Sequence, residues 1–123
     1  MEYINTEKAP KAIGPYSQAI CVNNMIYTSG QIAISPETNS LVEGDILAQT
    51  EQALKNLEQV LLASGSSLDK IIKTTVFVTD ISKFSLINEI YGKYITCKPA
   101  RSLVEVNSLP KGALIEIEAI AYR

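Results

Sequence analysis

The stretch LIEIEAIAY, residues 114–122, decides how this chain folds. Its composition predicts a β-strand, in which successive side chains point to opposite faces of the sheet. One face then carries only isoleucine and alanine, whereas the other carries apolar residues beside the two carboxylates of Glu116 and Glu118. A strand that is mostly apolar on both faces predicts a sheet covered on both sides, by helices on one and by another subunit on the other.

Outward from this strand, the spacing of apolar residues predicts six further elements. These are strands over 16–22 and 25–32, a helix over 46–64, a strand over 71–79, a helix from about residue 80 that stops before Pro99, and a strand over 101–106. Asn23-Asn24 predicts a two-residue hairpin turn, because asparagine tolerates a positive φ. Asp45 is the expected N-cap of the first helix, and Gly65 follows its last turn.

The predicted order is therefore β-β-α-β-α-β-β, an α+β fold with a mixed sheet and both helices on one face. No linker or low-complexity tract divides residues 1–123, so we expect a single domain. The face without helices is expected to meet another copy of the chain, which predicts a homo-oligomer built sheet against sheet.

Composition excludes several classes of function. The net charge is −2, which argues against a non-specific nucleic-acid binder. The chain has no histidine, so mechanisms based on Ser-His-Asp or Cys-His are excluded, and Cys21 and Cys97 have no metal-ligand spacing. No apolar run reaches the roughly 18 to 20 residues of a membrane span, and residues 1–10 lack the features of a signal peptide. We expect a cytoplasmic protein with no metal, no cofactor and no membrane partner.

Arg101 is the first candidate for a functional residue. It is the only arginine besides Arg123 at the end of the chain, and it begins a predicted strand directly after Pro99-Ala100. A guanidinium group held by a rigid backbone matches a carboxylate in bidentate fashion. The alternative is a structural salt bridge to a glutamate, and the pattern alone does not decide between the two.

Glu116 and Glu118 are the candidate proton-transfer groups, since a strand places both on one face. A carboxyl group in apolar surroundings has a raised pKa and exchanges protons near neutral pH. The alternative, which the pattern alone favours, is an ion pair at a strand edge or an interface.

Three further positions attract attention. Tyr16 follows a Gly-Pro pair and forms either a pocket wall or the aromatic core at a strand start. Ser29-Gly30 interrupts a β pattern, as happens where a ligand approaches the backbone. Asn88 borders the apolar stripe of the second helix and hydrogen-bonds either a ligand or a neighbouring backbone. The residues alone indicate no more than a small-anion pocket with Arg101 and a glutamate.

Six segments together are more specific than any one residue. They are AIGPYSQA (12–19), YTSGQI (27–32), KTTVFVTD (73–80), INEIYGKY (87–94), PARSLVEV (99–106) and LPKGALIEIEAIA (109–121). The combination resembles the reactive intermediate deaminases, the RidA/YjgF family, over essentially the whole chain.

This resemblance implies a chorismate-mutase-like α+β fold and a homotrimer, with sheets facing inward and a ligand cleft at each subunit interface. It implies hydrolysis of enamine and imine acids, such as 2-aminoacrylate, 2-aminocrotonate and their imine tautomers, to 2-keto acids and ammonia. By motif position, Arg101 would bind the substrate carboxylate and Glu116 would activate water. Tyr16 would line the cleft, and Ser29, Gly30 and Asn88 would complete it, partly from a neighbouring subunit.

Two departures from the family pattern bear on the cleft. Leu103 stands where many members have cysteine, and because it shares a strand face with Arg101 it is expected to line the cleft and make it more apolar. The stretch between Tyr94 and Arg101 is about one residue shorter than usual, and Pro99 biases Lys98 towards an extended conformation.

Two other functions remain open. The first is a non-catalytic module that binds small ligands, a role that trimeric relatives can have. The second is the endoribonuclease or translation-inhibitor activity that is attributed to some relatives. The sequence gives the second little support, since it has no basic stripe and no aromatic platform for RNA.

Overall fold

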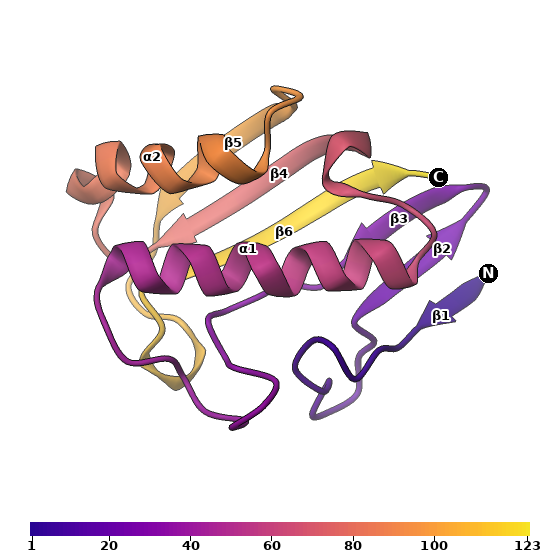
Figure 1. The fold of residues 1–123 in the computed structure, drawn as a ribbon, viewed down its shortest axis with the longest axis horizontal. Helices are drawn as coiled ribbons and strands as arrows, with labels where there is room; N and C mark the ends of the chain where they lie inside the picture. The colour runs from indigo at the N-terminus through magenta and orange to yellow at the C-terminus, as the bar shows by residue number, and fades with distance from the viewer.

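The computed structural model describes residues 1–123 as one six-stranded sheet with two helices in front of it (Figure 1). The strands lie side by side in the order β1-β2-β3-β6-β4-β5. The elements are β1 (Glu2–Ile4), β2 (Ala19–Val22), β3 (Met25–Thr28), α1 (Ile46–Ala63), β4 (Ile71–Val78), α2 (Phe84–Tyr94), β5 (Ala100–Glu105) and β6 (Ile115–Tyr122).

Strand β6 lies inside the sheet, as its sequence predicts. It pairs antiparallel with β3 on one side and with β4 on the other. Its side chains alternate between buried and partly buried, with Ile115 and Ile117 completely buried and Glu116 and Glu118 partly exposed. One face of the strand therefore belongs to the core, and both glutamates lie on the other face.

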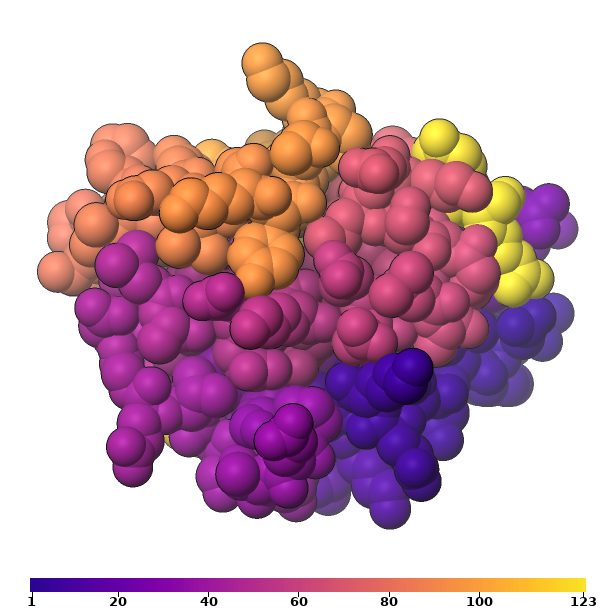
Figure 2. Space-filling model, in the orientation of Figure 1, coloured from indigo at the N-terminus to yellow at the C-terminus, as the bar shows by residue number.

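Both helices cover the same face of the sheet, so the predicted mixed α+β architecture is confirmed (Figures 1 and 2). Helix α1 buries one side, including Leu54, Leu57 and Leu61, against the sheet. Its N-cap is Asp45, whose carboxylate accepts hydrogen bonds from two backbone N–H groups of the first turn. Gly65 follows the helix with φ +79°, as expected of the residue that ends it.

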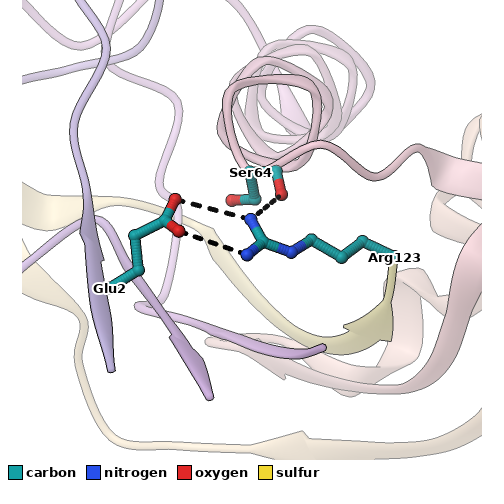
Figure 3. A network of polar contacts seen from close by, with 3 residues as sticks. All are labelled: Glu2, Ser64 and Arg123. Atoms are coloured by element: carbon teal, nitrogen blue, oxygen red, sulfur yellow. Dashed lines mark hydrogen bonds and ion pairs between the residues drawn. The ribbon is translucent and has the colours of Figure 1, made fainter. Parts of the chain in front are cut away.

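Strand β1 is absent from the predicted order, which is wrong at this point. It has three residues, two of them exposed, and pairs antiparallel with β2 at the edge of the sheet. So short a strand shows no periodicity in the sequence. It is joined instead to the other end of the chain, where Arg123 contacts both Glu2 and the backbone of Ser64 (Figure 3).

The first hairpin is shorter than predicted. Asn23 and Asn24 form its turn with φ of 51° and 61°, as expected, but the paired residues reach only from Ala19 to Thr28. The segments before and after leave the ladder, and Gln31 returns to β6 through an isolated bridge to Ile117. The Ser29-Gly30 pair lies in this interruption.

The face of the sheet away from the helices carries large apolar side chains that remain exposed. Among them are Tyr3, Tyr27, Val104 and Tyr122, from β1, β3, β5 and β6. We call this surface the open face. Neither helix is long and apolar enough to cross a membrane.

Candidate functional site

Glu116 lies on the open face, directly against the backbone of Gly30. A Cβ atom added to Gly30 would lie 2.6 Å from both Cδ and Oε2 of Glu116, closer than side chains approach one another. Only glycine therefore allows the carboxylate to occupy this place. The interruption that Ser29-Gly30 makes in the strand pattern corresponds to a close approach of a side chain to the backbone.

The surroundings of Glu116 raise the pKa of its carboxyl group above the usual 4.5. The larger cause is burial, which disfavours the charged form, and the smaller is repulsion from the neighbouring carboxylate of Glu118. No salt bridge compensates either glutamate within the chain. Within the chain, therefore, no ion pair holds Glu116, and its carboxyl group is suited to exchanging a proton with a bound reactant.

Ser29 ties the segment that carries Tyr16 to the strand beside Glu116. Its hydroxyl donates a hydrogen bond to the carbonyl of Ser17 at 2.5 Å, and its backbone N–H donates to the carbonyl of Gln18 at 2.9 Å. The side chain of Tyr16 is 55% exposed, so it does not form the aromatic core of a strand start.

Tyr16 and Gly30 line the same cavity, which has a volume of about 410 Å³. Gln18, which also lines it, was not identified from the sequence. Its buried side-chain amide accepts a hydrogen bond from Thr6 N–H at 2.7 Å and donates to the carbonyls of Thr6 and Pro10 at 3.0 and 2.8 Å. This amide holds the segment before Tyr16 in place as one wall of the cavity.

Arg101 lies in the edge strand β5, on the face that the helices cover. It pairs with Thr74 of β4, whose side chain is buried under α2, and neighbours in paired strands point to the same face. Its Nη1 donates a hydrogen bond to Oδ1 of Asn88 at 2.8 Å. No carboxylate lies within salt-bridge distance, so within the chain Arg101 is not a structural ion pair.

Tyr91 completes the surroundings of Arg101 and was not identified from the sequence as a site residue. Its ring lies under the guanidinium, with Cζ of Arg101 4.8 Å from the ring centroid. Its hydroxyl shares a hydrogen bond of 2.7 Å with Oγ1 of Thr74. The signal available in the sequence was its spacing of three residues from Asn88, which puts both on one side of a helix.

Leu103 shares a strand face with Arg101, as predicted, since the two pair with Val76 and Thr74 of β4. Its side chain packs against the hydrophobic core. That it lines the ligand cleft stays a prediction.

The connection between α2 and β5 projects from the edge of the molecule (Figures 1 and 2). Lys98, expected to be extended, has φ +53° instead, because the chain must reverse within a few residues to pass from α2 into β5. Lys98 lines a second cavity, of about 510 Å³, together with Asn88, Tyr91 and Arg101.

The predicted site residues therefore form two groups in one chain. Tyr16, Ser29, Gly30 and Glu116 lie together beside the open face, whereas Asn88 and Arg101 lie on the helix side of the edge strand β5. One group supplies a carboxyl group with a raised pKa, and the other supplies an uncompensated cation. No group of three or more histidine, cysteine or acidic side chains is placed to hold a metal ion.

Comparison with known proteins supplies a further finding. The family model described as endoribonuclease L-PSP matches residues 6–123. A RutC family protein of Pyrococcus abyssi is 52% identical over 123 residues, covering 99% of this chain and 97% of its own. The human 2-iminobutanoate/2-iminopropanoate deaminase is 49% identical over 121 residues, covering 98% of this chain and 88% of its own.

Solved structures agree with the fold over its whole length. A putative endoribonuclease from Thermotoga maritima superposes with a TM-score of 0.98 at 51% identity, covering 100% of this chain and 98% of that one. The E. coli protein TdcF, solved with bound serine, has a TM-score of 0.93 at 42% identity, covering 100% and 99% of the two chains.

Proposed function

Because the chain belongs to the L-PSP/RidA family, we propose that it hydrolyses reactive imine and enamine acids of the 2-iminopropanoate and 2-iminobutanoate type to 2-keto acids and ammonia. The mammalian relatives named for this activity are about half identical to the chain. The observation that carries the proposal is the pair of unpaired charges, an arginine without a carboxylate and a half-buried glutamate without a cation.

Arg101 binds the carboxylate of the substrate. Its single side-chain hydrogen bond goes to a neutral amide, so its charge is uncompensated and its remaining N–H donors are free. A guanidinium fork and a carboxylate match in bidentate geometry, and this orients the imine carbon next to the acid group. The carboxylate is the only anionic group of the smallest 2-imino acids, which suits a site with a single fixed cation.

Glu116 activates the attacking water. It accepts a proton from the water as the oxygen attacks C2 of the protonated imine, which gives a carbinolamine. It then returns the proton to the nitrogen, and the C–N bond breaks as the carbinolamine hydroxyl loses its proton to solvent, which releases ammonia and leaves the 2-keto acid. A carboxyl group with a raised pKa performs both transfers, and an imine is electrophilic enough to need no metal or covalent nucleophile.

The two groups of residues complete each other across a subunit interface of a homotrimer. Three observations support this part of the proposal. Arg101 and Glu116 lie on opposite faces of the sheet, Arg101 belongs to an edge strand, and the open face, on which Glu116 lies, carries exposed aromatic side chains. A neighbouring copy packed on the open face brings the Arg101 of one subunit to the Glu116 of the next.

The test adds the purified protein to a serine or threonine dehydratase with its substrate and follows release of the keto acid. The wild-type chain is expected to accelerate the release, and Glu116→Gln is expected to lower the acceleration by about 10²- to 10⁴-fold, the usual contribution of a proton-transfer group. No acceleration by the wild-type chain would overturn the proposed reaction.

Mixed trimers test the shared interface separately. Arg101→Ala and Glu116→Gln chains, each nearly inactive, are unfolded together and refolded. If each site takes its arginine and its glutamate from different subunits, about a quarter of the sites in a random mixture contain both native residues. Recovery of activity towards that level is expected, and no recovery would show that the two residues act within one chain.

Ligand binding without catalysis is the second candidate, because the similar protein TdcF was solved with serine bound. Binding of pyruvate that depends on Arg101, with no deamination by the wild-type chain, would favour it. The ribonuclease activity in the family's description gains no support from a chain of net charge −2.

A further inference from the structure

Tyr91 presents the face of its ring to the guanidinium of Arg101. Its ring lies beneath the guanidinium at 4.8 Å, while Asn88 holds Nη1 from the side at 2.8 Å. A cation over an aromatic face is attracted by the negative charge above the ring. Ring and amide together restrict a side chain that is otherwise exposed at the edge of the sheet.

The ring itself cannot turn away. Tyr91 is buried in α2 among core residues, and its hydroxyl shares a hydrogen bond with Thr74, which is completely buried in β4. Thr74 is also the residue that pairs with Arg101 in the ladder. The sheet thus fixes the backbone of Arg101 and, through Thr74 and Tyr91, the platform under its side chain.

We propose that Tyr91 is a positioning residue that holds the guanidinium of Arg101 in the orientation that receives a small carboxylate. The part that concerns a carboxylate rests on the proposed function. The part that concerns the guanidinium rests on the contacts alone. Tyr91 uses its ring for Arg101 and its hydroxyl for Thr74, so the two contributions can be separated by substitution.

The chain offers a direct measurement because it contains only two arginines. The ¹⁵N-labelled full chain should show two Nε–Hε signals, from Arg101 and Arg123, and Arg123 serves as the internal control. Tyr91→Leu removes the ring, and the order parameter of Arg101 is expected to fall into the flexible range, below about 0.6, with Arg123 unchanged. Tyr91→Phe keeps the ring and is expected to leave both signals ordered.

Tyr91→Leu also changes the packing of the core, so fluorinated phenylalanines at position 91 serve as a second test of the ring. They keep the shape of the ring and weaken the negative charge above it, so the order of Arg101 should fall in steps with the number of fluorine atoms. Thr74→Val is the matched control for the Tyr91 hydroxyl. It removes the hydrogen bond between Thr74 and Tyr91 by changing Thr74, whereas Tyr91→Phe removes the same bond by changing Tyr91.

The kinetic readout is the KM for an imine acid generated in solution. Loss of a cation–π contact corresponds to a roughly 2- to 30-fold change in an equilibrium constant. Tyr91→Leu should raise KM within that range with a smaller change in kcat, whereas Tyr91→Phe, which keeps the ring, should raise KM by a smaller factor than Tyr91→Leu.

Each outcome decides the proposal. Greater mobility of Arg101 alone, with a raised KM, supports it. An Arg101 that stays ordered in Tyr91→Leu and in the fluorinated series overturns it, as does equal loosening of both arginines. If the wild-type chain shows no deamination but Arg101 still loosens, the proposed function fails while the positioning role stands.

Discussion

The two guanidinium groups of the chain have opposite surroundings. Arg123 contacts both carboxylate oxygens of Glu2, at 3.1 and 3.4 Å, and the carbonyl of Ser64 at 3.1 Å (Figure 3). Arg101 contacts an aromatic ring and a neutral amide, with no carboxylate nearby. The first is an ion pair that joins the ends of the chain, and the second is a cation held in place without being neutralised.

This difference separates a structural arginine from a candidate binding residue. A guanidinium already paired with a carboxylate must lose that partner before it receives another. Arg101 has no such partner to lose, and its orientation is set by groups that carry no charge. The alternative of a structural salt bridge to a glutamate, open for Arg101 from the sequence, is realised by Arg123.

Removal of each arginine in turn should give the largest contrast. Arg101→Ala is expected to lower kcat/KM for an imine acid by about 10- to 150-fold, the loss of a hydrogen-bonded charge pair with the substrate, with little change in Tm. Arg123→Ala is expected to lower Tm and leave kcat/KM unchanged. Steady-state kinetics and thermal unfolding of both variants check this, and a large fall in activity in Arg123→Ala would show that the two roles are not separate.

A substitution that gives Arg101 a carboxylate partner should make its surroundings similar to those of Arg123. Asn88→Asp nearly preserves the shape of the side chain and gives Arg101 the kind of partner that Arg123 has. At this exposed position the new pair is worth little to stability, but it competes with the substrate carboxylate, and KM is expected to rise by about 2- to 5-fold. Added salt should reduce the effect by screening the pair. An unchanged KM would mean that substrate does not use the free charge of Arg101.

The smallest effect is expected at the Arg123 ion pair. The hydrogen bond and charge of Arg123 lower the pKa of Glu2 below 4.5, so the pair contributes stability above that pH and loses it as pH falls through the lowered pKa. Glu2→Gln should therefore be slightly less stable than wild type at neutral pH, and the gap should close as the pH falls below the lowered pKa of Glu2. Urea unfolding over this range measures the gap, and one that persists in acid would need a cause other than the ion pair.

Much of the fold could be predicted because its signals are local. The alternation in β6, the Asn23-Asn24 turn and the capping of α1 by Asp45 each depend on residues close in the sequence. Strand β1 could not be predicted, because three residues carry no periodicity and its partners lie far along the chain. The left-handed conformation of Lys98 was also missed, since the local effect of Pro99 is overridden by the reversal between α2 and β5.

The candidate site divides in the same way. Motifs in the sequence select Arg101, Glu116, Tyr16 and Gly30, but they do not show that Arg101 and Glu116 lie on opposite faces of one sheet. That follows from the register of β4 between β5 and β6, which is a property of the assembled sheet. The roles of Tyr91 and Gln18 were missed because a tyrosine in an apolar stripe and a glutamine beside a strand look like ordinary packing until their partners are known.

The sequence by itself determined most of the strands, both helices and the side chains that share a face in β6, because these depend on spacing along the chain. Only the tertiary structure decided which arginine is neutralised and which remains a free cation. Glu2 and Arg123 stand 121 positions apart, and Thr74 and Tyr91 stand 17 apart. Charge compensation depends on distance in space, and folding alone brings such groups within a few ångströms of each other.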